Sequence, residues 1–220
     1  MSDKASKVRR YRGRTPEELR AERRDRLLDA ALSLFAERGY ANTTIEQLCS
    51  TARVTTRHFY EQFDGREGLL RDLLESIVAG TLRSAWKELL NEERDMTQRV
   101  GDAIRSVMLY LLKDPRRGRI VCLETIGVSR DLERRRRVLI HDFASLIEQY
   151  GGYLAGSGLL PLRDYRLPAV ALVGATMELI QEWLNGGTDM DAEGVAQEAV
   201  LFFRALIIGA QRYEEAREDS

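Results

Sequence analysis

The chain has 220 residues, of which 44% are hydrophobic, 31% are charged and 4 are prolines, and its formal net charge is −1. This length allows one or two domains with a sizeable core, and the composition is that of a globular protein rich in helix-forming residues. Collagen-like, membrane-spanning, disulfide-rich and zinc-finger classes are excluded. No apolar run approaches the roughly 20 residues of a membrane span, and two cysteines with two histidines far apart fit neither a disulfide framework nor a zinc site. We therefore expect a cytoplasmic protein that has no cofactor and no membrane contact.

The charge is unevenly distributed along the chain. Residues 1–14 carry a net charge of +5 and residues 1–66 carry +4, whereas the remaining 154 residues carry −5. A basic N-terminal part joined to an acidic remainder indicates a local site for a polyanion. Residues 1–15 also lack a hydrophobic period, so we expect them to form a flexible basic arm.

A first helix is predicted to begin after Thr15 and to end before Gly39. Thr15 can cap the N-terminus, Pro16 suits the first helical position, and Gly39 suits the position after the last turn. Apolar residues at three- and four-residue steps give this helix one buried face: Leu27, Leu28, Ala31, Leu34 and Phe35.

Two short helices are predicted next, separated by a tight break at Arg53-Val54. Thr44 and Gln47 have the spacing of a capping box, and Thr55 can cap a second helix that extends to Tyr60. Two short helices joined by a tight break make a helix-turn-helix, the second helix of which can enter the major groove of DNA.

The candidate DNA contacts cluster at the starts of these helices. Arg57 can form two hydrogen bonds with guanine, Thr56 can contact a thymine methyl group, and Tyr60 can donate to a phosphate. Arg66, in the first turn of the following helix, opposes the positive end of the helix dipole, which a nearby phosphate would explain. The full set is Thr44, Thr55, Thr56, Arg57, His58, Tyr60 and Arg66, with Arg9, Arg10, Arg12 and Arg14 of the basic arm following the DNA backbone or entering the minor groove. The alternatives are a helical turn with solvated polar side chains and a tail that only aids solubility.

Around these residues the sequence resembles regulators of the tetracycline-repressor (TetR/AcrR) family. The resemblance is carried by residues 27–45 and 59–70, which include Tyr-x-x-Phe followed by basic-Glu-x-Leu-Leu, and it covers about residues 23–72 without gaps. Arg53 stands where the family usually has glycine, so keeping the turn requires a left-handed arginine at about 1–2 kcal/mol. Arg66 stands where the family usually has lysine. The resemblance implies a homodimeric transcriptional regulator, usually a repressor, that a small molecule releases from a palindromic operator.

The remainder is also predicted to be helical, so the fold class is all-α, with a three-helix helix-turn-helix head and a helical C-terminal domain. The expected helices are a long one from Asp64-Gly65 to about Leu90, followed by 97–113, 116–127, 130–155, 166–185 and 191–217. The expected domains are the basic arm (1–15), the DNA-binding domain (16–65) and a ligand-sensing and dimerisation domain (66–220).

The last two predicted helices are apolar over more than one face and carry small residues that allow close helix approach. Two such helices from each chain can form a four-helix interface between two copies. The residues assigned to it are Val173, Gly174, Met177, Ile180, Trp183, Leu184, Phe202, Phe203 and Leu206. The alternative is that this surface packs only within one chain.

A ligand cavity is expected among the middle helices, lined by aromatic and polar side chains that interrupt apolar stripes. The candidates are Trp86, Tyr110, Cys122, Glu124, Thr125, His141, Phe143, Met177, Glu178 and Gln181. Each also fits a role in the core or on the surface. The four arginines of residues 134–137 span a full helical turn and are interpreted as a solvated segment.

Two other functions remain open. One is a protein that binds or organises DNA without a ligand. The other is a small helical enzyme that uses His141 with Glu124 or Cys122, but the sequence has no P-loop, nucleophile elbow or metal-ligand spacing. We therefore predict that the chain is not an enzyme and that its partners are double-stranded operator DNA, a second copy of itself and an unidentified small molecule.

Overall fold

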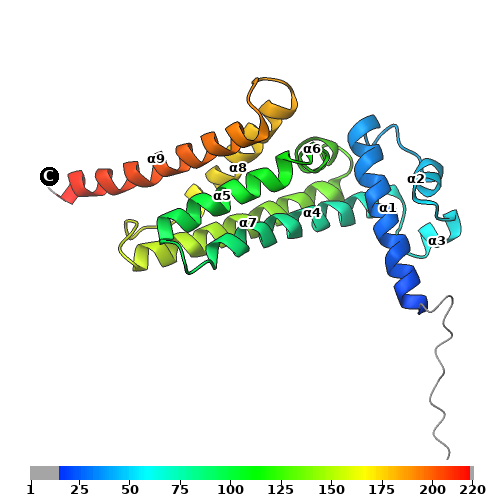
Figure 1. The fold of residues 1–220 in the computed structure, drawn as a ribbon, viewed down its shortest axis with the longest axis horizontal. Coiled ribbons are helices and arrows are strands. Elements are labelled where there is room, and N and C mark those ends of the chain that lie inside the picture. Colours follow the sequence, from blue (N-terminus) through cyan, green and yellow to red (C-terminus); the bar gives the residue numbers. More distant parts are fainter. Residues whose placement is uncertain (1–14, 219–220) are drawn as a thin grey trace, which may run out of the picture. The chain divides into compact units, whose positions relative to one another are not determined.

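The computed structural model describes residues 15–218, and this part of the chain is helical without a strand, which confirms the all-α prediction. The predicted contacts Arg9, Arg10, Arg12 and Arg14 lie outside the described residues. The elements in chain order are α1 (Pro16–Arg38), α2 (Ile45–Ala52), α3 (Thr56–Tyr60), α4 (Arg66–Leu89), α5 (Met96–Leu112), α6 (Pro115–Arg119), the π-helix η1 (Ile120–Glu124), α7 (Arg130–Gly156), α8 (Arg166–Leu184) and α9 (Ala192–Glu218). Figure 1 labels the α-helices. No described helix is both long and apolar enough to cross a membrane.

The chain forms two compact units, Met1–Leu73 and Leu74–Ser220, which we call the head and the body. The division lies inside α4, eight residues beyond the boundary that the sequence placed at the start of this helix. The first part of α4 belongs to the head because Leu69 and Leu70 are fully buried there and Asp72 forms an ion pair of 2.9 Å with Arg24 of α1.

Local capping interactions explain where the helices of the head begin. The Thr15 hydroxyl accepts from the backbone N–H of Glu18, and the Glu18 carboxylate accepts from the backbone N–H of Thr15. Thr44 and Gln47 form the same reciprocal pair at the start of α2. Both predicted caps are confirmed, and each satisfies two backbone donors that a helix start leaves open.

The turn between α2 and α3 is left-handed at Arg53, with φ 53° and ψ 46°. The backbone N–H of Arg53 donates to Ser50 O, and that of Val54 donates to Cys49 O at 2.9 Å. The predicted conformation is therefore present, and Arg53 carries the associated strain of about 1–2 kcal/mol. In the described part of the chain it is the single non-glycine residue with a positive φ.

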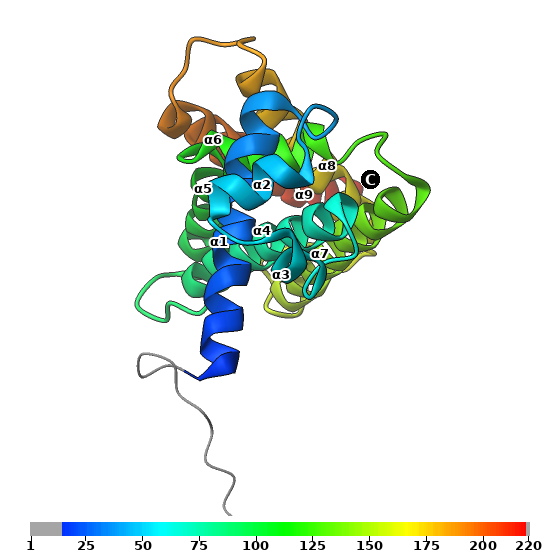
Figure 2. The same ribbon diagram turned by 90° about the vertical axis from the view of Figure 1, so that its right-hand side faces the viewer.

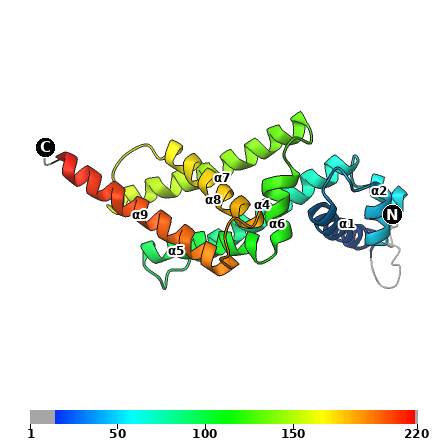
Figure 3. The same ribbon diagram turned by 90° about the horizontal axis from the view of Figure 1, so that it is seen from above.

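In the body, α9 lies against α5 and α8 lies against α7 (Figure 3). The fully buried side chains include Met108, Leu112, Ile120, Leu132 and Ile180. The single helix predicted over residues 116–127 is wrong, because the chain forms the short α6 and then the wider π-helix η1. A π-helical turn takes one more residue than an α-helical turn, and such turns are frequent at functional sites.

Candidate functional site

The short helix α3 is held in the head by one fully buried side chain, Phe59. Phe63, with its ring centroid 5.7 Å from that of Phe59, and Val54 before the helix are also buried. From α1, Arg20 Nη2 donates to Glu61 O at 2.9 Å, just after α3. Figure 2 shows α2 and α3 as two short helices beside the longer α1. These contacts fix which face of α3 turns outward.

The outward face carries the residues that the sequence assigned to DNA contact. Thr55, Thr56, Arg57 and Tyr60 are exposed, and Tyr60 exposes 60% of its surface although it is aromatic. Thr55 caps α3 by accepting from the backbone N–H of His58, which is half-buried. Thr44, at the start of α2, is exposed as well. The head therefore presents together the hydroxyl groups, guanidinium and phenol that bind phosphates and base edges.

Glu61 is an acidic residue on this face, and it was not among the DNA contacts assigned from the sequence. Its carboxylate accepts from His58 Nδ1 at 2.8 Å and from Arg57 Nε at 3.1 Å. The hydrogen bond from His58, followed by the bond from Arg57 and the charges of both partners, lowers the pKa of Glu61. Glu61 is thus ionised at neutral pH and holds two of the candidate DNA contacts.

The Glu61→Gln variant is expected to bind DNA about three- to tenfold more tightly at low salt. The substitution removes a negative charge that repels phosphates and releases Arg57, and the gain should shrink as salt screens the charges. Fluorescence anisotropy with a labelled duplex at several salt concentrations measures the effect. Glu198→Gln, on the exposed surface of α9, is the matched control and should leave affinity unchanged. A weaker Glu61→Gln complex would mean that the carboxylate itself positions Arg57 for DNA.

Arg66 has partners inside the head that the sequence did not anticipate. Its Nη1 donates to Tyr40 O at 3.1 Å and to Thr43 O, and the guanidinium lies 4.9 Å from the centre of the Tyr40 ring. Thr43 is fully buried and donates from its hydroxyl to Gly39 O. Arg66 therefore ties the loop between α1 and α2 to the start of α4, which accounts for a cation at the positive end of a helix without a phosphate.

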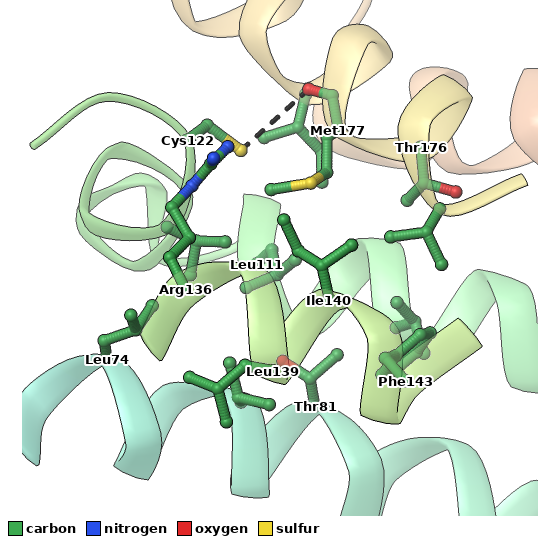
Figure 4. A pocket seen from close by; sticks show the side chains of 15 residues that line it. Leu74, Thr81, Leu111, Cys122, Arg136, Leu139, Ile140, Phe143, Thr176 and Met177 are labelled. Carbon is green, nitrogen blue, oxygen red and sulfur yellow. Dashed lines mark hydrogen bonds between the residues drawn. The ribbon is translucent and has the colours of Figure 1, made fainter. Parts of the chain in front are cut away.

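The body contains a cavity of about 80 Å³ between α4, α5, η1, α7 and α8 (Figure 4). Its lining is apolar except for the side chains of Thr81, Cys122, Arg136 and Thr176. The apolar lining residues are Leu74, Val78, Val107, Leu111, Val121, Leu139, Ile140, Phe143, Val173, Met177 and Ile180. This volume is smaller than the ~300–1,000 Å³ of most small-molecule sites, so an occupant must be compact or must widen the cavity.

Three of the predicted ligand residues, Cys122, Phe143 and Met177, line this cavity. The other seven do not line it. Trp86, His141 and Glu178 are exposed, and Glu124 is half-buried. Thr125 donates to Val121 O, Tyr110 stacks against Arg117 at 4.3 Å, and Gln181 donates to Glu178. Sequence periodicity locates polar residues that interrupt apolar stripes, but it could not distinguish the cavity side of each helix from its outer side.

Arg136 is the main cavity residue that the sequence assignment missed. The run of arginines at 134–137 was interpreted as solvated, and this is corrected for Arg136, because its Nε is buried without a hydrogen-bond partner. A usable signal was present, since Leu132, Arg136, Leu139 and Phe143 follow one another at three- and four-residue steps on α7.

Cys122 is a buried thiol whose pKa is raised to about 12 by burial, partly opposed by the nearby Arg136 cation. Burial also raises the pKa of Cys49. Both thiols are therefore protonated at neutral pH, which disfavours nucleophilic or redox reactivity because the thiolate is the reactive form.

In the folded protein, Cys122 is expected to react with a thiol reagent such as DTNB at pH 8 at least about 1,000-fold more slowly than in denaturant. Because the pKa is raised on folding, the unfolded thiol ionises first, so stability from this group is lost as pH rises from 9.0 towards about 12. A Cys49→Ser background isolates the Cys122 signal. Rapid labelling without unfolding would instead show that the cavity opens to solvent.

The structure changes the set of residues available for an interface between copies. Val173, Ile180 and Phe203 are buried within the chain, so they offer little surface to a second copy. Met177 lines the cavity, Leu184 is half-buried, and Trp183 Nε1 donates to Met190 O. Gly174, Phe202 and Leu206 remain exposed, and the structure adds the exposed side chains Leu167 of α8 and Leu201 and Ile208 of α9.

Comparison with known proteins finds a family match in the head and a shared fold over most of the chain. Residues 27–73 match the family model described as "Bacterial regulatory proteins, tetR family". The HTH-type transcriptional regulator HbdR of Aromatoleum sp. (strain CIB) is 29% identical over 159 residues, covering 70% of this chain and 67% of that protein. The fatty acid degradation regulator FadR from Bacillus halodurans has a similar structure, with a TM-score of 0.73 and 18% identity over 80% of this chain and 95% of that chain. FadR from Bacillus subtilis, solved in complex with stearoyl-CoA, gives a TM-score of 0.71 and 18% identity over the same shares.

A helix-turn-helix head joined to an all-helical body defines a DNA-binding transcriptional regulator rather than an enzyme. The head matches the TetR family model, and the chain is similar to HTH-type transcriptional regulators over most of its length.

Proposed function

We propose that the protein is a homodimeric repressor that binds a palindromic operator through α3 and dissociates when a small molecule enters the body. The observation that supports the DNA-binding role is that α3 has one buried and one exposed face. Phe59 is buried in the head, whereas Thr56, Arg57 and Tyr60 are exposed. A short helix presented in this way can enter the major groove, and two copies related by a twofold axis would match two half-sites.

The operator test begins with selection of bound duplexes from a random DNA pool, followed by binding assays on the selected site. Arg57→Ala and Tyr60→Ala are each expected to weaken operator binding about 5- to 150-fold, the effect of losing a base-edge or phosphate contact. Arg134→Ala and Tyr153→Ala are matched controls on α7, because Arg134 is similarly exposed and pairs with an acid one turn away, and Tyr153 is 58% exposed. Selection of no inverted repeat, or full affinity in both α3 variants, would overturn the proposal.

The dimer is supported by apolar surface that the body leaves uncovered. On α9, Leu201, Phe202, Leu206 and Ile208 each expose 45–49% of their surface. On α8, Ala171 and Gly174 are exposed and small, which allows another helix to approach closely. Large apolar patches of this kind are typical of protein interfaces.

The Phe202→Glu/Leu206→Glu double variant is therefore expected to be monomeric in light scattering, whereas the wild type is dimeric. Leu162→Glu is the control, because Leu162 is 86% exposed but lies outside α8 and α9. A monomeric wild type would mean that there is no such interface. A double variant that remains dimeric would mean that the interface lies elsewhere.

The ligand response is supported by the cavity and by the likeness to FadR from Bacillus subtilis, which was solved with stearoyl-CoA. Because α4 runs from the head into the body, a ligand that prefers one arrangement of α4 can shift the spacing of the two heads. The alternative, a regulator that binds DNA without a ligand, predicts that no metabolite raises the melting temperature or weakens operator binding.

A further inference from the structure

The cavity in the body exposes a surface that is apolar throughout, although four polar side chains take part in its lining. Thr81, Cys122, Arg136 and Thr176 are among the lining residues, but none of their polar atoms contributes to that surface. Arg136 is half-buried, and what it adds to the lining is the carbon part of its side chain. The cavity surface therefore offers an occupant no hydrogen-bond donor and no acceptor.

The hydrogens of three of these polar side chains are directed at the backbone. The hydroxyls of Thr81 and Thr176 each donate to the carbonyl four residues earlier in the same helix, at 3.0 and 2.9 Å. The Cys122 thiol is directed at Met177 O, 3.9 Å away, as the dashed line in Figure 4 shows. A ligand group that forms hydrogen bonds would have to break one of these contacts or stay unpaired, and both are unfavourable.

An apolar cavity of about 80 Å³ has room for water, but it does not hold water stably. A buried water molecule needs two to four polar partners, and the cavity surface supplies none. Without an occupant, the lining side chains lose dispersion contacts on the side that faces the cavity. An apolar occupant would restore those contacts without giving up hydrogen bonds inside the protein.

The wall of the cavity includes two features that suit an occupant. The π-helix η1 supplies Val121 and Cys122, and π-helical turns are rare and frequent at functional sites. Met177 of α8 is half-buried, and its unbranched side chain has three rotatable bonds. A methionine in the wall can change its rotamer and so admit an occupant larger than the empty volume.

We propose that this cavity binds a compact, uncharged hydrocarbon that forms no hydrogen bonds, and that such a molecule is the ligand of the regulator. The inference rests on the proposed function, because it names the class of small molecule to which the same body would respond. A longer ligand with a polar end group would need a donor or an acceptor at one end, and no polar atom lies at the cavity surface. Engineered apolar cavities of about 150 Å³ stay dry and bind benzene, which makes benzene a suitable probe.

Isothermal titration calorimetry with benzene and pyridine tests this ligand class directly. The two rings have nearly the same size and shape, but pyridine, uncharged at pH 8, has a nitrogen that accepts a hydrogen bond. Wild-type protein is expected to bind benzene at least about fivefold more tightly than pyridine, because the nitrogen would lose its hydration and find no donor. Benzene should also raise the melting temperature of the wild type, since it binds the folded state.

Two variants with opposite effects locate the binding in the cavity. Val173→Phe fills the cavity from α8 and should weaken benzene binding at least about tenfold, whereas Leu111→Ala enlarges it from α5 and should strengthen binding about two- to tenfold. Val138→Phe and Leu162→Ala are the matched controls, because these residues are 46% and 86% exposed and do not line the cavity. Both controls should bind benzene like the wild type.

Three results would overturn the proposal: no benzene binding by the wild type, pyridine binding as tight as that of benzene, or benzene binding that a folded Val173→Phe variant retains in full. If circular dichroism shows that Val173→Phe does not fold, Leu111→Ala decides instead, and unchanged or weaker benzene binding would overturn the proposal. Tighter binding of hexanoyl-CoA than of benzene would also overturn it, because the cavity would then receive only the end of a longer ligand.

Operator binding separates this inference from the proposed function. Benzene should weaken the operator complexes of the wild type and Val138→Phe but not that of Val173→Phe. A protein that selects an operator and never binds benzene would end the hydrocarbon proposal and leave the regulator standing. Benzene binding in the cavity of a protein that selects no operator would do the reverse.

Discussion

The Phe59→Ala variant is expected to lose operator binding while the body remains folded. Phe59 is fully buried and is the only buried residue of α3, and its ring lies against Phe63. Replacing a buried phenylalanine with alanine typically destabilises by about 3–5 kcal/mol, which is a large part of the stability of a small domain. A helix of five residues cannot persist without that anchor.

Hydrogen exchange followed by mass spectrometry distinguishes a local from a global effect. Protection should fall in the peptides that contain α2 and α3 and persist in those that contain α5, α7 and α8. Phe202→Ala is the control, since Phe202 is 45% exposed on α9 and its loss should leave the head unchanged. Normal operator affinity in Phe59→Ala would mean that α3 is held mainly by contacts other than this ring.

The Arg66→Met variant is expected to destabilise the head by about 2–4 kcal/mol. It removes the hydrogen bonds to Tyr40 O and Thr43 O and the stacking on the Tyr40 ring, leaving acceptors in the loop without their donor. Methionine keeps much of the aliphatic packing, so the loss reports mainly on these polar contacts. Urea unfolding followed by circular dichroism measures the free energy of unfolding.

Arg66→Lys separates the structural role of this residue from a role in DNA binding. Lysine keeps the charge and can still donate to a carbonyl, so most of the stability should return. If Arg66 acted only on phosphate, Arg66→Met would reduce operator affinity and its salt dependence while leaving the unfolding curve unchanged. That outcome would restore the interpretation made from the sequence.

The helix starts of the head could be predicted from the sequence because each depends on residues that are close together in the chain. A threonine three residues before a glutamate or glutamine sets the cap at Thr15 and at Thr44. The left-handed turn at Arg53 was expected from the resemblance to a family that usually has glycine at this position. The role of Arg66 was not predictable in this way. Its acceptors, Tyr40 O and Thr43 O, are backbone atoms more than twenty residues away, and their approach depends on how α1, α2 and α4 pack.

The cavity and the exposed apolar surface were less accessible to sequence reasoning because they depend on packing between distant segments. The cavity draws its lining from five elements between Leu74 and Ile180. Periodicity groups the apolar residues of α8 and α9, but it could not separate Val173 and Phe203, which pack inside the chain, from Phe202 and Leu206, which do not.

The strained turn at Arg53 has a consequence for how this regulator can change over generations. Every arginine codon becomes a glycine codon through a single base substitution, and glycine would relieve most of the left-handed strain. Proteins tolerate new destabilising substitutions only while they stay above a stability threshold. A lineage that acquires glycine here could afterwards accept a costly replacement in α3, and thereby adopt a different operator, without passing through an unfolded ancestor.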